Sequence, residues 1–159
     1  MTDGAPEHLA VRFIVPGADG RSVLLTADGV LPAAEADVDE AVAAIVPIDR
    51  FVRSSWGLTA PILETHPKWK EADTGGPIPT LVWTEPVAAG WTPPEGLAFG
   101  PIPSDLADLA PPIRPRAEEV LAELRSGAVP PPLRPRWARR GWFDRSSAWM
   151  RAAAEAAQG

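Results

Sequence analysis

Short apolar runs separated by turn residues are the main pattern of this 159-residue chain. The first run, residues 8–15 (HLAVRFIV), is rich in β-branched residues and ends at Pro16, which predicts a strand. The turn sequence at residues 17–20 leads to a second run at residues 21–26, so we expect an antiparallel hairpin. Residues 27–36 contain Asp-Gly and proline and are predicted to form a loop.

A helical pattern follows this loop. Asp37 is placed to cap a helix that begins at Val38, with acidic residues in its first turn. That helix meets Pro47, which cannot continue it without a kink and which can itself open a second helix. In the second helix an apolar stripe at i, i+3 and i+4 predicts a buried face, and Gly57 suits a helix C-terminus. The stripe consists of Ile48, Phe51 and Val52.

The second half of the chain holds short apolar runs and two further helical patterns. Pro61 places the first of these runs at a sheet edge, because proline cannot donate a ladder hydrogen bond. The predicted strands are residues 58–65, 80–84 and 97–99, and the predicted helices are residues 116–126 and 143–157, with Gly127 ending the first of the two.

Strands and helices mixed without regular alternation predict an α+β fold, with a largely antiparallel sheet between helices. The proline-rich stretch after residue 127 favours an extended, polyproline-like chain. We therefore expect a compact domain over residues 1–127, a Pro/Arg-rich linker over 128–141 and a C-terminal docking helix over 142–159.

Composition narrows the function classes. The chain has 20 Pro and 7 Trp, two His and no Cys, which excludes disulfide scaffolds, zinc fingers, thiol enzymes and iron–sulfur sites. No apolar stretch reaches the ~18 residues of a membrane span. The N-terminus lacks the pattern of a secretory signal, so we expect no membrane association and a cytoplasmic protein.

Charge is distributed unevenly along the chain. The formal net charge is −6, yet residues 134–159 hold six Arg against two acidic residues. The remainder holds nine basic and nineteen acidic residues, and such a body would repel phosphates. We therefore expect an acidic body that does not bind nucleic acid, followed by a basic tail.

Residues 50–58 (RFVRSSWGL) form a predicted helix end that follows two strands and precedes another. The segment resembles the end of the Nudix box, the signature of the Nudix hydrolases, whose pattern is G-x5-E-x7-R-E-U-x-E-E-x-G-U with U apolar. Registered on Gly57 and Leu58, the Arg of the pattern falls on Arg50 and an apolar position on Val52. The flanking order of elements is also similar to the Nudix fold. The resemblance thus implies a Nudix-like mixed, largely antiparallel sheet flanked by helices.

The same register replaces the family's carboxylates. Three Glu of the pattern fall on Phe51, Ser54 and Ser55, the upstream Glu on Val42 and the opening Gly on Ala36. In active members these carboxylates hold divalent metal ions that activate water for attack on a diphosphate, and Mg²⁺ prefers carboxylate ligands. Neither Phe nor Ser supplies a carboxylate. We therefore expect a binding or regulatory module with no catalytic residue, metal ligand or cofactor at this motif.

The end of the chain carries a second resemblance. Its Pro-rich stretch and W-x-R-x-G-W-[FL] segment look like the junction that joins a degenerate Nudix-like domain to an aminoglycoside phosphotransferase-like kinase domain. This resemblance implies a kinase-like partner domain, or self-association, through an Arg/Trp segment. The candidate partner-binding residues are Arg134, Arg136, Trp137, Arg139, Arg140, Trp142, Phe143 and Trp149.

Arg interleaved with aromatic residues in this tail is also similar to a single-stranded nucleic-acid surface. The acidic body argues against that partner, and Trp and Arg dominate the energetics of protein interfaces. A protein partner is therefore the favoured interpretation, with a nucleic-acid adaptor as an alternative.

A small nucleotide-like ligand is a further expectation, because the resemblance implies a pocket lined by aromatic residues near the late strands. The candidate pocket residues are Arg50, Trp83, Glu85, Trp91 and Phe99. One alternative keeps the chain an active metal-dependent hydrolase of nucleoside diphosphate derivatives, with its metal ligands displaced to carboxylates such as Glu35, Asp37 or Glu85. The acidic residues at 35, 37, 39 and 40 are otherwise explained as a solvated helix start.

Overall fold

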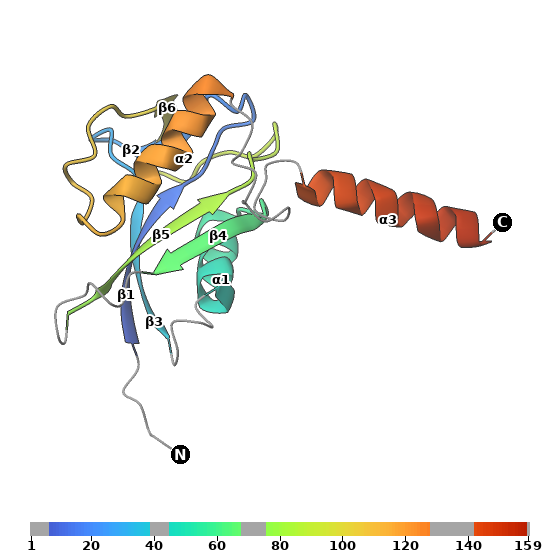
Figure 1. Ribbon diagram of the computed structural model, residues 1–159, viewed down its shortest axis with the longest axis horizontal. Helices are drawn as coiled ribbons and strands as arrows, with labels where there is room; N and C mark the ends of the chain where they lie inside the picture. The colour runs from blue at the N-terminus through green and yellow to red at the C-terminus, as the bar shows by residue number, and fades with distance from the viewer. Residues whose placement is uncertain (1–6, 39–44, 68–75, 128–141, 159) are drawn as a thin grey trace, which may run out of the picture.

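Six strands and three helices lie in the part of the chain that the computed structural model describes, residues 7–38, 45–67, 76–127 and 142–158 (Figure 1). The strands are β1 (Glu7–Ile14), β2 (Ser22–Thr26), β3 (Ala33–Val38), β4 (Ile62–Pro67), β5 (Ile78–Thr84) and β6 (Leu97–Pro101), and the helices are α1 (Ile45–Trp56), α2 (Arg114–Ser126) and α3 (Trp142–Gln158).

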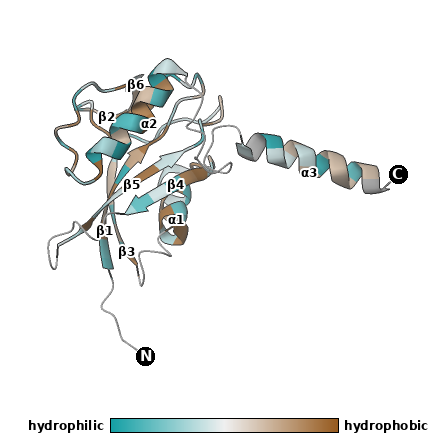
Figure 2. Cartoon of the chain, viewed as in Figure 1, coloured by the Kyte–Doolittle hydropathy of each residue, from teal (hydrophilic) through white to brown (hydrophobic). Residues whose placement is uncertain are grey.

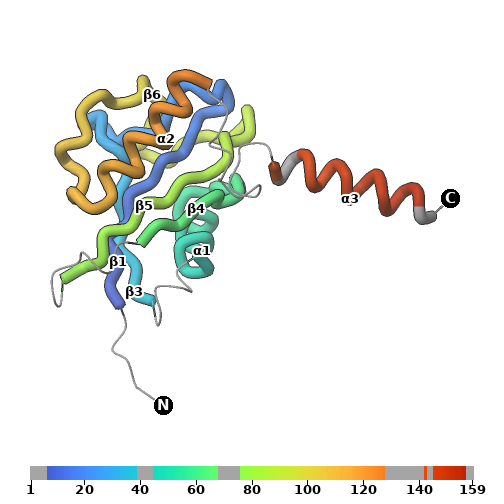
Figure 3. The backbone as a smooth tube through the Cα atoms, viewed as in Figure 1, coloured from blue at the N-terminus to red at the C-terminus, as the bar shows by residue number. Residues whose placement is uncertain are grey.

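Two sheets organise the body. The larger sheet has the order β3-β1-β5-β4, in which β1 and β5 run parallel and the other two pairings are antiparallel. The backbone trace shows β1 and β5 side by side through the centre of the body (Figure 3). The smaller sheet is the antiparallel pair β2-β6. The predicted α+β class with a largely antiparallel sheet is thus confirmed.

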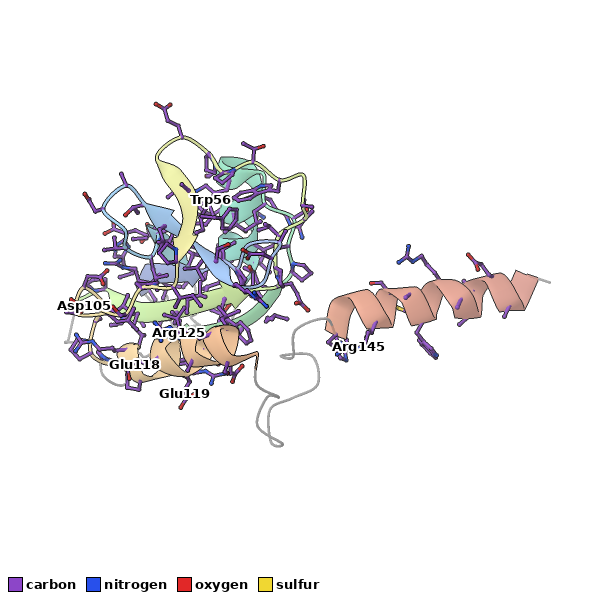
Figure 4. The ribbon with its side chains drawn as sticks, turned by 90° about the horizontal axis from the view of Figure 1, so that it is seen from above. Trp56, Asp105, Glu118, Glu119, Arg125 and Arg145 are labelled. Carbon is purple, nitrogen blue, oxygen red and sulfur yellow. The ribbon has the colours of Figure 1, made fainter. Side chains whose placement is uncertain are left out.

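Alternation along the two central strands sets the layers, because successive side chains of a strand point to opposite faces. In β1, Leu9, Val11 and Phe13 belong to the core cluster that also contains α1 residues. In β5, Leu81 and Trp83 belong to the other cluster, with α2 residues. The two helices therefore cover opposite faces of the larger sheet, as the view from above shows (Figure 4).

The predicted hairpin between the first two strands forms only beside its turn. Gly17 N–H donates to the carbonyl of Ser22, and Leu24 N–H donates to that of Val15, each at 2.9 Å. Along its whole length, Ser22–Thr26, β2 pairs with β6 through its other edge. The hairpin prediction was wrong for most of its length because both edges of β1 are occupied by β3 and β5, so β2 must find another partner.

Residues 33–38 also differ from the prediction, which placed a loop to residue 36 and a helix from Val38. They form the edge strand β3, in which Leu9 of β1 faces Ala36 and His8 faces Asp37. Long-range pairing with β1 overrides the local turn and capping signals, because it satisfies backbone groups that a loop would leave to water. Asp37 is therefore a strand residue and does not cap a helix.

Helix α1 begins at Ile45, so Pro47 lies in its first turn, where a missing N–H costs no helical hydrogen bond. Residues 39–44, the predicted body of a preceding helix, lie outside the described residues. The predicted apolar stripe is confirmed: Ile48 and Val52 are buried and Phe51 is half-buried. The helix meets the sheet through this stripe.

Gly57 ends α1 in the left-handed conformation, with φ of 61°. Its N–H donates to Arg53 O and the N–H of Leu58 donates to Val52 O, both at 3.1 Å, which is the Schellman pattern. A Cβ at Gly57 would meet no atom within 4 Å, so the demand for glycine comes from the backbone conformation alone.

We expect Gly57→Ala to lower the free energy of unfolding by about 1–2 kcal/mol, because a Cβ disfavours the left-handed region. Urea denaturation measures this change. Gly90→Ala is the matched control, since Gly90 has no positive φ and its added Cβ would also meet nothing within 4 Å. Equal stability of the two variants would contradict the capping role of Gly57.

The remaining helices begin close to their predicted positions. Helix α2 starts at Arg114, two residues before the prediction, with Pro115 in its first turn, and Gly127 ends it with φ of 62°. Helix α3 extends one residue beyond the predicted helix at each end, and residues 128–141 before it lie outside the described part of the chain. None of the helices in the described ranges has the length and apolar character needed to cross a membrane.

Candidate functional site

A groove of about 580 Å³ lies beside α1, and we call it the α1 groove. Its apolar side chains are Ile45 and Val46 from the first turn of α1 and Ile62 from the edge strand β4. Ile45 and Val46 are 47% and 59% exposed, and the start of α1 is coloured as hydrophobic in Figure 2. The volume of the groove is that of a pocket that accepts a small molecule or a few protein side chains. The groove is lined by Ile45, Val46, Asp49, Arg50, Arg53, Ser54 and Ile62.

Polar residues of α1 complete the groove. Arg53 Nε donates to Asp49 Oδ2 at 2.6 Å, an i,i+4 pair that neutralises both charges. Arg50 is exposed and has no ion-pair partner among the described residues. The groove thus combines an apolar floor with one cation that can meet an acidic or polar group of an occupant.

Three residues that stand where the Nudix pattern has a Glu lie in the described part of the chain, and their environments differ. The Phe51 ring packs against Phe13 and Trp56, with ring centroids 6.1 and 5.4 Å away. Ser54 and Ser55 are exposed, and Ser54 Oγ donates to the carbonyl of Phe51 at 3.3 Å. Phe51 therefore stabilises the attachment of α1 to the sheet, at the position where the family pattern has a Glu.

Trp91 and Phe99 are the two predicted pocket residues that the structure brings into contact. Their ring centroids lie 5.9 Å apart in an edge-to-face arrangement. Trp91 Nε1 donates to the carbonyls of Trp56 and Gly57, both at 3.2 Å, and so satisfies the C-terminal end of α1. Trp56, the last residue of α1, is labelled in Figure 4. The indole N–H of Trp91 is thus engaged in holding the helix end.

Trp83 lies on the other face of the sheet, away from Trp91 and Phe99. It is 2% exposed and belongs to the core cluster beneath α2. Its Nε1 donates to Glu64 Oε2 at 3.0 Å. Arg116 of α2 donates to both oxygens of the same carboxylate, at 3.3 and 2.6 Å. These three side chains connect β5, β4 and α2.

Glu85, which follows β5, is 5% exposed, and its N–H donates to the carbonyl of Pro61 at 2.9 Å. The strand register places it far from the other proposed metal ligands: Trp83 lies opposite Ile14 at one end of β1, whereas Asp37 lies opposite His8 at the other end. Within the described residues, no group of three or more His, Cys, Asp or Glu side chains is arranged to hold a metal ion.

His8 and the acidic residues of β3 form a separate exposed cluster. His8 Nδ1 lies 2.7 Å from Asp37 Oδ1, and His8 Nε2 lies 3.5 Å from Glu35 Oε2. The hydrogen bond to Asp37 raises the pKa of His8 above its ordinary value, with the charges of both carboxylates adding to the effect. The cluster therefore links the β1 and β3 edges through the His8 imidazole.

Because the pKa of His8 is raised in the folded state, its contribution to stability is fully present below the unfolded value of about 6.5 and is lost as the pH rises through the folded value. We expect an NMR titration of the imidazole protons to give a His8 pKa above 6.5, and Asp37→Asn to lower it. Glu35→Gln is the control and should lower it less. An unchanged pKa in Asp37→Asn would contradict the assignment.

The predicted partner-binding residues fall largely outside the described ranges. Arg134, Arg136, Trp137, Arg139 and Arg140 lie in residues 128–141, and the side chain of Phe143 is not described. Of the other two, Trp142 is half-buried at the start of α3, and Trp149 is 72% exposed in its middle.

Comparison with known proteins gives no match for this chain, either among protein-family models or among curated proteins.

The apolar residues of the α1 groove could not be predicted from the sequence pattern. In the sequence, Ile45 and Val46 belong to an apolar run that predicts burial. Only their position before Pro47 distinguishes them from the residues that α1 buries. Ile62 comes from a strand that no local signal connects with α1. The one available signal for an exposed site was an apolar residue that lies outside the buried face of the helix, and Val46 is such a residue.

Proposed function

We propose that this chain is a non-catalytic, Nudix-like module that binds a protein segment in the α1 groove. The observation that carries the proposal is the surface of α1 itself. The helix that resembles the Nudix box presents exposed Ile45, Val46 and Arg50 in the groove, while Phe51 packs against the core rings. A half-exposed apolar floor beside an available cation suits an amphipathic protein segment.

The fold supports the resemblance on which this proposal rests. A mixed α+β body with a largely antiparallel sheet, and a helix that ends in Gly57-Leu58, are what the resemblance implies. Ser54 and Ser55 are exposed on the last turn of α1, so the register puts neutral hydroxyls where the family has carboxylates. Helix α1 would therefore bind a protein segment and take no part in catalysis.

The tail belongs to the same proposal. Its Arg/Trp segment would contact a kinase-like partner domain or a second copy of the chain, as its sequence implies. One observation supports a contact of this kind: Trp149 is 72% exposed on α3, which leaves a large apolar side chain available to either partner.

An assay of diphosphate cleavage tests the non-catalytic assignment. The full chain is incubated with ADP-ribose and Mg²⁺ or Mn²⁺, and products are compared with those from a parallel reaction containing EDTA. We expect no metal-dependent cleavage. Metal-dependent turnover that is lost on Glu85→Gln or Asp37→Asn would overturn the proposal in favour of a hydrolase with displaced ligands.

A further inference from the structure

The most exposed large hydrophobic side chains of the described residues fall into two pairs. Ile45 and Val46 open α1 and form part of the floor of the α1 groove. Trp149 and Met150, 72% and 57% exposed, lie midway along α3. Leaving such side chains in water is unfavourable, and Trp is enriched among the residues that dominate interface energetics. Each pair therefore gains from being covered, and because every copy of the chain carries one of each, two copies can cover each other's pairs.

The shape of α3 suits it as an occupant. Its 17 residues make a rod about 25 Å long. Six of these residues are Ala, five of them after Arg151, so the last turns carry little side-chain bulk beside Trp149 and Met150. The described side chains from Ala148 to Glu155 are all exposed, and Figure 1 shows α3 clear of the body. The helix can thus place Trp149 and Met150 in a groove while its small residues approach the surface closely.

The position of α2 bears on whether α3 reaches its own groove or that of another copy. Helix α2 covers the face of the larger sheet opposite to α1, so an α3 that docked on its own chain would have to pass round an edge of the sheet to reach the groove. Fifteen residues, 127–141, separate the two helices, and they can span at most about 54 Å. Four of them are Pro, a composition that favours an extended chain over one that turns back.

We propose that α3 of one copy docks in the α1 groove of a second copy, with Trp149 and Met150 against Ile45, Val46 and Ile62. This inference rests on the proposed function, because it names the occupant of the same groove. A twofold exchange makes the contact twice. Each Trp side chain can bury about 150–250 Å². Together with two Met side chains and two Ala-rich helix faces, the area buried in the dimer approaches the ~1,200 Å² lower limit of specific interfaces.

Light scattering on the full chain tests the exchange. We expect the mass to rise with concentration from 16.9 kDa towards twice that value. Trp149→Ser, and separately Ile45→Asp with Val46→Asp, should each hold the chain at the monomer mass. Aspartate in the first turn of a helix is favourable, so the second variant should remain folded, and circular dichroism checks this. Ser55→Ala and Glu155→Gln are the matched controls on α1 and α3 and should associate like the wild type.

Mixing the two defective variants separates exchange between copies from docking within one chain. The Trp149→Ser chain keeps an intact groove and the Ile45→Asp/Val46→Asp chain keeps an intact α3, so an equimolar mixture can form one of the two contacts. We expect a dimer to reappear, with an association at least about tenfold weaker than in the wild type because one contact is missing. A mixture that stays monomeric, a monomeric wild type at every concentration, or defective variants that still dimerise would each overturn the proposal.

The outcome is independent of the diphosphate assay. Cleavage of ADP-ribose by a chain that dimerises as described would overturn the proposed function and leave the exchange standing. A monomer without cleavage would overturn the exchange alone.

Discussion

Trp83→Ala should lower the free energy of unfolding by about 3–5 kcal/mol, the largest single effect we expect in this protein. Trp83 is 2% exposed and fills the core beneath α2. Its removal leaves a cavity that the surrounding strands cannot close, and it also removes the N–H that Glu64 accepts at 3.0 Å. Urea denaturation followed by circular dichroism measures the loss.

Two further variants show where the effect arises. Trp83→Phe keeps most of the ring volume and loses the hydrogen bond, so we expect a smaller loss of about 1–2 kcal/mol. Trp149→Ala removes a Trp that is 72% exposed and should change stability by no more than about 0.5 kcal/mol at monomeric concentrations. Similar losses for Trp83→Ala and Trp149→Ala would contradict the assignment of Trp83 to the core.

Arg116→Met should cost about 2 kcal/mol at neutral pH, because it leaves the Glu64 carboxylate partly buried with its main partner removed. The Glu64 and Arg116 side chains are 23% and 19% exposed and meet at 2.6 Å. The expected cost of about 2 kcal/mol is below the range for fully buried ion pairs, since water still reaches both side chains. Adding Glu64→Gln to Arg116→Met should recover part of the loss, because the unpaired charge is then absent.

The pH dependence of the same variant gives an independent test. Burial alone would raise the pKa of Glu64, but hydrogen bonds from Arg116 and Trp83 and the charge of Arg116 outweigh it and hold that pKa below its ordinary value. The stabilisation is therefore present above the unfolded pKa and is lost as the pH falls through the folded one. We expect the difference in unfolding free energy between wild type and Arg116→Met to shrink on acidification. A difference that is constant from pH 7 to acid would contradict the role of the pair.

Local sequence signals were sufficient to predict where helices end and which strand lies at a sheet edge. The end of α1 at Gly57 and the end of α2 at Gly127 follow from glycine in the left-handed conformation. Pro61 correctly indicated an edge strand, since β4 lies at the edge of the larger sheet. Pairing partners could not be predicted in the same way, because they depend on which strand edges remain free. Strand β3 shows this: only pairing with β1 turns a proline-flanked, apparently looped segment into an edge strand.

The candidate site was predictable only in part. Arg50 was selected from the motif register and does lie in the α1 groove. Trp83 and Trp91 were selected as aromatic residues near late strands, but their N–H groups donate to Glu64 and to the end of α1. No local pattern distinguishes a Trp whose N–H is used within the fold from one that faces a ligand. That distinction depends on residues distant in the sequence.

The central proposal is that α3 of a second copy docks in the α1 groove, which includes Ser54, one of the positions where the Nudix pattern has a Glu. Its most direct test is a nuclear magnetic resonance titration of ¹⁵N-labelled Trp149→Ser chain with unlabelled Ile45→Asp/Val46→Asp chain. We expect the amide signals of Ile45, Val46 and Ile62 in the labelled chain to shift and saturate as the unlabelled chain is added, while those of β2 and β6 stay in place. Shifts confined to other elements, or none up to the solubility limit, would contradict the account.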